Sequence, residues 1–131
     1  MAVLIGIAAG LFLIAHGLVH LLYLLPKQDD PGFPFTLKES WLVPEAVRRP
    51  VGIGLVAVTV AAFLLLGLAV WGVPGLSGSW PVIAIVSAVL SLVLLAAYWD
   101  SHLIIGVCVD FALIVLAVTL LGLQAFLQIV D

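Results

Sequence analysis

Charge is what this sequence has least of. Only 8% of its 131 residues are Asp, Glu, Lys or Arg, and Lys and Arg together number four. Soluble domains carry about a quarter of their residues charged and roughly half apolar, whereas 66% of this chain is hydrophobic. So few charges cannot cover a water-facing surface or a nucleic-acid-binding face. The composition excludes a soluble or disordered protein and predicts an integral membrane protein whose surroundings are the lipid bilayer.

Cysteine and the common catalytic motifs are also scarce. Cys108 is the single cysteine, so neither an intrachain disulfide nor a Cys-x-x-Cys redox pair can form, and a buried structural thiol is expected. The chain has no Gly-rich phosphate loop with a lysine and no Gly-x-Ser-x-Gly nucleophile elbow. No catalytic residue and no cofactor can be assigned, and a protein that is not an enzyme is favoured.

Long apolar stretches account for most of the chain. A helix needs about 20 apolar residues to cross the hydrocarbon core of a bilayer. Four stretches predict such helices, namely 2–25, 51–73, 81–98 and 103–128. Lipid leaves no partner for unpaired backbone groups, so each stretch should be helical, and short connections make consecutive helices antiparallel. The predicted fold is all-α, a single membrane domain 1–131 built as an antiparallel four-helix bundle.

The positive charges indicate an orientation. All four basic residues lie in the predicted loop 26–50, as Lys27, Lys38, Arg48 and Arg49. Because positively charged loops stay on the cytoplasmic side, this loop should be cytoplasmic and both termini outside. The expected location is the plasma membrane, which the chain crosses several times.

Prolines mark the expected helix ends. Pro26 should stop the first helix, and Pro50 and Pro81 should stand at the first position of theirs, where a missing N–H is tolerated. A short interfacial helix is expected around 37–47. A cleaved signal peptide is disfavoured for 2–25, because this stretch has no basic N-terminal region and its apolar run is too long.

One polar side chain from each span falls at a similar depth. We count residues from the loop-side end of each span, at a rise of about 1.5 Å per residue. The four polar side chains then lie roughly 12 Å inside the membrane boundary. They are His16, Thr59, Ser91 and Asp110. Polar groups facing lipid are costly, so these side chains should face the bundle interior.

Helical periodicity extends this polar layer. His16, His20 and Tyr23 recur at i, i+4 and i+7 and so share one face of the first helix. Asp110, Gln124 and Gln128 lie within about 40° of one another on the last helix. The second group of candidates, which could line a ligand site, comprises Tyr23, Tyr98, His102, Gln124 and Gln128.

Asp110 is the most informative residue. An ionised Asp near the centre of a span costs about 2.5–3.5 kcal/mol on insertion scales, so it should be protonated, paired or hydrated. No span contains Lys or Arg, which makes His16 the expected hydrogen-bond partner. The bond could be structural, or it could belong to a proton relay or a ligand site. His16 and His20, with Asp110 or His102, could also hold zinc, iron or copper.

Two short windows resemble known membrane proteins. The stretch Gly10-Leu-Phe-Leu-Ile-Ala-His16-Gly17-Leu-Val-His20 resembles the first helix of DoxX-like proteins, which have four helices and often a His-Gly pair in the first. The turn Trp99-Asp100-Ser101-His102 is similar to one found before the last helix in other small four-helix membrane proteins. DoxX-like proteins commonly carry a basic residue in the first helix, which this chain lacks. The resemblance implies membrane-bound partners, sometimes of redox systems, and carries over no catalytic residue.

Three functions stay open at this point. The first is a membrane protein that acts by binding, as an accessory subunit of a membrane complex or as a homo-oligomer, with Gly6 and Gly10 offering a close-contact face. The second is a redox protein that binds a metal, haem or a quinone at His16, His20 and Asp110. The third is a proton-coupled carrier of small solutes with Asp110 as its titrating group.

Overall fold

The computed structural model describes residues 1–25 and 30–130, and these residues form helices and connecting segments with no strand. The long helices are α1 (Ala2–Val19), α2 (Glu45–Val70), α3 (Trp80–Ala97) and α4 (Ile104–Val130). Three short 3₁₀ helices adjoin them, η1 (His20–Leu24), η2 (Ser77–Ser79) and η3 (Ser101–Leu103). The predicted all-α class is confirmed.

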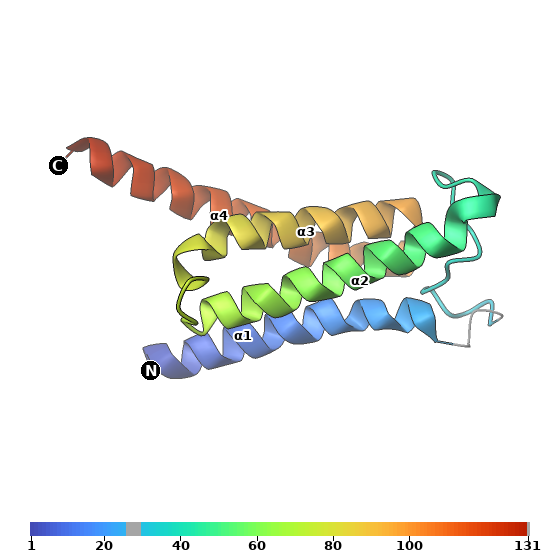
Figure 1. The fold of residues 1–131 in the computed structure, drawn as a ribbon, viewed down its shortest axis with the longest axis horizontal. Helices are drawn as coiled ribbons and strands as arrows, with labels where there is room; N and C mark the ends of the chain where they lie inside the picture. Colours follow the sequence, from blue (N-terminus) through green and yellow to red (C-terminus); the bar gives the residue numbers. More distant parts are fainter. Residues whose placement is uncertain (26–29, 131) are drawn as a thin grey trace.

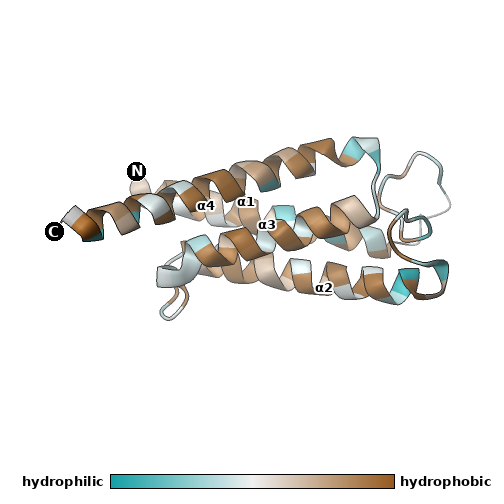
Figure 2. Ribbon diagram, turned by 90° about the horizontal axis from the view of Figure 1, so that it is seen from above, coloured by the Kyte–Doolittle hydropathy of each residue, from teal (hydrophilic) through white to brown (hydrophobic). Residues whose placement is uncertain are grey.

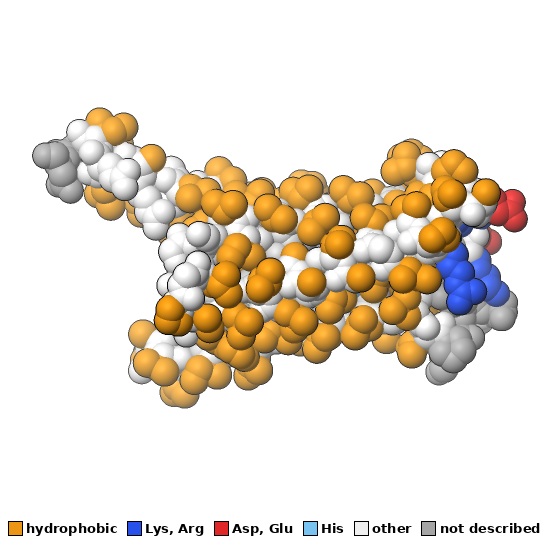
Figure 3. All heavy atoms as spheres, viewed as in Figure 1, with side chains coloured by type: hydrophobic (Ala, Val, Ile, Leu, Met, Phe, Trp, Pro, Cys, Tyr) orange, Lys and Arg blue, Asp and Glu red, His pale blue; other side chains and the backbone are white. Residues whose placement is uncertain are grey.

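The helices run up and down, which places both termini at one end of the molecule and the long loop at the other (Figure 1). We call these the terminal end and the loop end. Four helical segments are long and apolar enough to cross a membrane, Ala2–Leu24, Glu45–Val70, Ser77–Ala97 and Ser101–Ile129. The helices are mostly hydrophobic along their length (Figure 2), and the charged side chains visible in Figure 3 gather at the loop end. A four-helix membrane bundle is therefore the architecture.

The start of α2 differs from the prediction. The helix begins at Glu45, so Pro50 lies inside it and not at its first position. Pro44 precedes the helix, and Glu45 supplies a negative charge to the first turn, where the helix dipole favours one. The segment 37–44 contains no helix, so the predicted interfacial helix is wrong. Pro81 does lie in the first turn of α3.

Two of the residues that were assigned to the loop, Pro26 and Lys27, lie outside the described part of the chain. The same holds for Gln28 and Asp29. The predicted end of the first helix at Pro26 therefore stays a prediction. The described helical structure at this end reaches Leu24.

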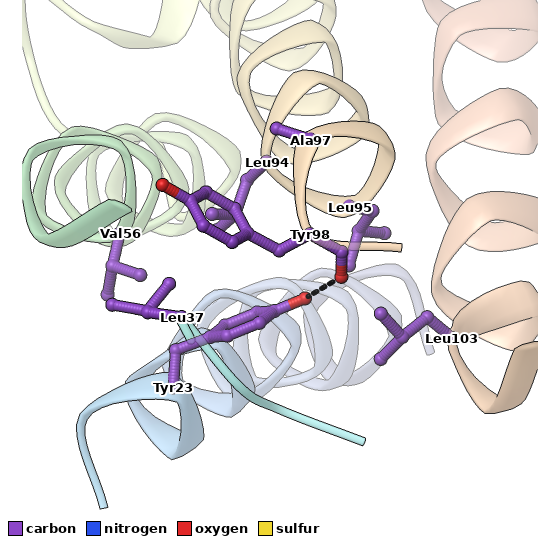
Figure 4. Close-up of a cluster of buried hydrophobic side chains, with 8 residues drawn as sticks. All are labelled: Tyr23, Leu37, Val56, Leu94, Leu95, Ala97, Tyr98 and Leu103. Carbon is purple, nitrogen blue, oxygen red and sulfur yellow. Dashed lines mark hydrogen bonds between the residues drawn. The ribbon is translucent and has the colours of Figure 1, made fainter. Parts of the chain in front are cut away.

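Buried aromatic and aliphatic side chains pack against one another at the loop end (Figure 4). Tyr23 and Tyr98 are buried, and the Tyr23 hydroxyl donates to the carbonyl oxygen of Tyr98 at 3.5 Å. The Tyr98 hydroxyl in turn donates to the carbonyl oxygen of Arg48 on α2. Ser40 Oγ donates to the carbonyl oxygen of Ala97 at 2.5 Å, which gives one of the unpaired carbonyls at the end of α3 a partner. The loop thus joins α2 and α3 through hydrogen bonds as well as packing.

Glycines bring α1 and α2 close together. A Cβ added at Gly17 would lie 2.3 Å from the Cβ of Phe63. One added at Gly10 would lie 2.0 Å from Nε1 of Trp71. A Cβ at Gly6, by contrast, would meet nothing within 4 Å. Of the pair Gly6 and Gly10, only Gly10 therefore serves a contact inside this chain.

One side of the bundle is open. Consecutive helices pack against each other, whereas α1 and α4 hardly touch in the described chain. The last buried residue of α4 is Ala117, and residues 122–129 are all exposed. Figures 1 and 3 show this end of α4 projecting beyond the other helices. The gap between α1 and α4 and the free end of α4 are the two departures from a closed bundle.

Candidate functional site

The predicted polar layer lies inside the bundle. Thr59, Ser91 and Asp110 are each 0% exposed, and the side chain of His16 is 11% exposed. The four residues come one each from α1, α2, α3 and α4. The expectation that these four side chains face the bundle interior is therefore confirmed.

The predicted hydrogen bond between the first and last helices is present. Nε2 of His16 lies 3.0 Å from Oδ1 of Asp110. The bond bridges α1 and α4 at the level where these helices otherwise hardly touch. The His16 ring lies beside two aromatic rings, with centroid distances of 5.0 Å to Phe63 and 6.4 Å to Phe12. The imidazole is thus held in one orientation by its neighbours, as expected for the partner of an intramembrane acid.

The contacts of His20 define its tautomer. Nδ1 lies 3.2 Å from the carbonyl oxygens of both His16 and Gly17. Carbonyl oxygens only accept hydrogen bonds, so Nδ1 carries the hydrogen. Nε2 lies 2.9 Å from Ser91 Oγ, and on a neutral ring it accepts the hydroxyl hydrogen. Both nitrogens of His20 are therefore engaged, Nδ1 with carbonyl oxygens at the end of α1 and Nε2 with α3.

Two buried oxygens of the polar layer have no hydrogen-bond partner among the described residues, namely Asp110 Oδ2 and Thr59 Oγ1. Buried polar groups without a partner are uncommon in folded proteins and call for an explanation. Asp110 uses one carboxyl oxygen for His16 and has the other available for a further hydrogen bond. Nothing in the geometry explains the unpaired hydroxyl of Thr59.

A cavity of about 230 Å³ lies on the loop-end side of the His16–Asp110 bond. All three histidines of the chain line it, His16 and His20 from the first helix and His102 from η3. His102 is at its exposed edge, and its Nδ1 lies 2.7 Å from Asp100 Oδ1. Hydrogen bonds from the backbone N–H and then the ring of His102 hold the pKa of Asp100 below its usual value. The polar groups of this cavity thus extend from the protein surface to the buried bond.

A larger cleft, of about 660 Å³, lies on the terminal-end side of the same bond. Its lining is almost entirely apolar and comes from all four helices. Its lining residues include Phe12, Leu13, Trp80, Val109, Ala112 and Leu113. Val109 lines both the cleft and the histidine-lined cavity. The two spaces therefore lie in line along the open α1–α4 side, with Asp110 next in sequence to the residue that they share.

Several other site predictions are wrong. Gln124 and Gln128 are exposed, because α4 has left the bundle before it reaches them and helical phase no longer decides which face is covered. Tyr23 and Tyr98 belong to the buried core at the loop end and line neither space. Cys108 is exposed on α4 and is not a buried thiol.

The predicted metal ligands are not assembled as a metal site. No group of three or more His, Cys, Asp or Glu side chains with suitable placement occurs in the part of the chain that the structure describes. The reason lies in the hydrogen bonds. His20 has both ring nitrogens engaged, and Nε2 of His16 is directed at Asp110.

Sequence reasoning missed the aromatic residues of the site. Phe12 precedes His16 by four residues, and Phe63 follows Thr59 by four. Side chains four apart share a helix face, so this spacing could have identified both rings as neighbours of the polar layer. Trp80 and Val109 carry no comparable signal, because only the separation of α1 from α4 makes them line a cleft.

Comparisons with models of protein families, with curated proteins and with solved structures found no match to this chain. The similarity of its two windows to DoxX-like and other small four-helix proteins stays a prediction.

Proposed function

We propose that this protein acts by binding within the membrane, and that its open α1–α4 side takes up a lipid-soluble molecule with a flat polar head, of the quinone class. One observation carries the proposal. An apolar cleft of about 660 Å³ ends beside a buried imidazole–carboxyl pair 3.0 Å apart. An apolar pocket with a few convergent polar groups is the usual form of a small-molecule site.

The chemistry of the two parts of the cleft matches the two parts of such a molecule. A quinone head presents carbonyl oxygens, which accept hydrogen bonds, on a planar ring that can stack. Phe12 offers a ring face at the closed end of the cleft, and the His16 ring stacks on it at a centroid distance of 6.4 Å. Asp110 follows Val109 of the cleft wall. When the His16–Asp110 pair holds an extra proton, Asp110 can donate it through the oxygen that has no partner among the described residues. The apolar tail would lie toward the terminal end between Leu113 and Trp80. Entry would be sideways from lipid, since α1 and α4 leave that side open.

The rival functions receive less support. A metal or haem site needs free imidazole nitrogens, and those of His20 are engaged. A carrier needs aqueous access to Asp110 from both sides of the membrane, whereas the cleft on the terminal side is apolar. Binding requires neither condition.

The orientation proposed is the one that the basic residues favour, with the loop end cytoplasmic in the plasma membrane and both termini outside. Lys38 lies in the loop, and Arg48 and Arg49 lie near the start of α2; the Lys and Arg side chains visible in Figure 3 are at the loop end. A reporter enzyme fused to the C-terminus tests this topology, because an external terminus requires activity of a reporter that works only outside the cytoplasm.

Association with another membrane subunit or a second copy is a further candidate function, and the free end of α4 favours it. The helix has 27 residues and is about 40 Å long, more than the roughly 30 Å of the hydrocarbon core. Leu123, Phe126 and Leu127 on its free end are all exposed. Where the helix extends beyond the hydrocarbon core, a partner subunit would cover these side chains in place of lipid. Crosslinking and native mass spectrometry of the full chain, compared with a chain ending at Leu121, test this association.

Tryptophan fluorescence tests the binding site directly. Trp80 lines the cleft, so a short-tailed benzoquinone titrated into liposomes with the protein should quench its emission saturably, and Trp80→Phe should remove that component. Ala112→Phe places a ring in the cleft and should weaken binding about tenfold, since lost contact of about 1.4 kcal/mol corresponds to that factor. Val115→Phe, on the exposed face of the same helix, is the matched control and should leave binding unchanged. Quenching that never saturates, or that the two variants alter equally, would contradict the proposal.

A further inference from the structure

We infer that the histidine-lined cavity is an aqueous vestibule, which brings water and hydronium ions from the loop end to the buried His16–Asp110 bond. The inference goes beyond ligand binding and does not depend on the quinone-class molecule, because it concerns the other side of the bond. It assigns this chain an intramembrane site that exchanges protons with one side of the membrane.

The shape of the cavity supports this access. It extends from the exposed His102 to Val109 beside Asp110, a separation of seven residues or about 10 Å along α4. Its volume is about 230 Å³. Each water occupies roughly 30 Å³ of liquid volume, so several can fit in line. Phe35 and Leu103 close its sides at the loop end.

Polar groups stand at both ends of this path, as a water chain requires. At the outer end, Asp100 and His102 are joined at 2.7 Å with the His102 side chain 74% exposed. At the inner end, Nδ1 of His16 has no hydrogen-bond partner among the described residues, because its one side-chain bond uses Nε2. His20 between them has both nitrogens engaged. His16 is therefore the group placed to receive a proton.

No other titratable group from the neighbouring helices faces the buried pair among the described residues, so His16 and Asp110 are the groups that exchange the proton. α2 faces the pair with Phe63 and contributes Thr59 to the polar layer, while α3 contributes Ser91; none of these is charged. His20 lies on α1's own extension, and Asp100 and His102 lie at the mouth.

The proton transfer balances simply. A hydronium ion gives its proton to Nδ1 of neutral His16 and becomes water. The resulting imidazolium keeps its Nε2–H hydrogen bond to the Asp110 carboxylate, so the buried pair becomes neutral overall. Release of the proton to water restores a pair with net charge −1.

Thiol labelling tests whether water reaches the site. Val109→Cys in a Cys108→Ala background places a thiol on the cavity wall, and the natural Cys108, exposed on the next position of the same helix, is the matched control. The thiolate is the reactive form and an apolar environment suppresses it. A charged, membrane-impermeant methanethiosulfonate applied from the loop side should therefore label Val109→Cys about tenfold faster than Cys108. Equal rates, or labelling of Val109→Cys only from the terminal side, would overturn the vestibule.

A second pair of variants keeps the test decisive if Val109→Cys fails to fold. Ile105 lines the cavity near its mouth, and the neighbouring Ile104 does not. With Cys108 replaced by alanine, Ile105→Cys should again be labelled faster than Ile104→Cys from the loop side.

Nuclear magnetic resonance tests the proton itself. In the full-length protein with ¹⁵N-labelled histidine in lipid bilayers, magnetisation transferred from water should reach His16 Nδ1 and remain absent from His20 Nδ1. Labelled cavity thiols without a water signal at His16 would overturn the assignment of His16 as the proton acceptor.

Discussion

The two halves of this bundle differ in how they are held together. At the loop end, Tyr98 and Ser40 tie the loop, α2 and α3 by side-chain-to-backbone hydrogen bonds, and the histidines tie α1 to α3 and α4. At the terminal end, α1 and α4 are separated along an apolar cleft and the end of α4 projects alone. Burial of apolar surface does not drive helices together in lipid, so packing and hydrogen bonds must. The hydrogen bonds of the loop end therefore hold the helices together, whereas the terminal end contains the largest open space of the described bundle.

The largest effect should come from the buried ring that packs against the histidines of the first helix. Phe63 is 0% exposed and touches His16, His20 and Gly17. Phe63→Ala should lower the free energy of unfolding by about 2–3 kcal/mol, at or below the soluble-core range because the unfolded helices stay in lipid. Phe111→Ala, on the exposed face of α4, should change little. Denaturation by an ionic detergent measures both, and equal losses would break the distinction between the halves.

Close helix approach gives the next effect. Gly17→Ala places a methyl group 2.3 Å from the Cβ of Phe63, which cannot move without its backbone, so a loss of about 1–3 kcal/mol is expected. Gly6→Ala at the terminal end meets nothing within 4 Å and should be neutral or stabilising by up to about 1 kcal/mol. The same detergent titration compares them. A tolerated Gly17→Ala would mean that α1 and α2 are less tightly joined at the loop end than the structure has them.

Much of the loop end could be predicted from the sequence. Lipid imposes helices on long apolar stretches, and an unpaired acid in a span without Lys or Arg requires a histidine at its own depth. Those two constraints were enough to predict the His16–Asp110 bond. The sequence could not show that His20 hydrogen-bonds to backbone carbonyls and does not bind a metal. Two histidines at i and i+4 are compatible with either arrangement.

The terminal end could not be predicted in the same way. Whether α4 stays against α1 depends on side-chain shapes along two helices far apart in the sequence, and the almost entirely apolar lining of the cleft gives no polar pattern that would mark it. Gln124 and Gln128 have the helical phase of Asp110, yet they are exposed because phase indicates a face and not what covers it. Proline at a first helical position is a common pattern and predicts a helix start at Pro50, whereas the chain is already helical from Glu45.

The His16–Asp110 bond between α1 and α4 should have a measurable coupling energy. In a double-mutant cycle of His16→Phe and Asp110→Leu, the two changes together should cost less than their sum, by about 0.6–2 kcal/mol, as for other interhelical hydrogen bonds in membranes. Asp110→Asn alone should retain part of the stability, because an amide oxygen still accepts from Nε2. Additive changes in the cycle would mean that the 3.0 Å contact contributes nothing to joining α1 and α4.

The smallest effect should be a pH dependence at the mouth of the vestibule. The N–H and ring of His102 hydrogen-bond Asp100 and lower the pKa of its carboxyl, so the folded state binds this proton more weakly than the unfolded state. The contribution to stability is therefore present near neutral pH and is lost as the pH falls through the lowered pKa. Because the Asp100 side chain is 38% exposed, solvent screening keeps this contribution small. The detergent midpoint of the natural protein should fall slightly more than that of Asp100→Asn between about pH 7 and about pH 3, and identical curves would show that the contact orients His102 without stabilising the fold.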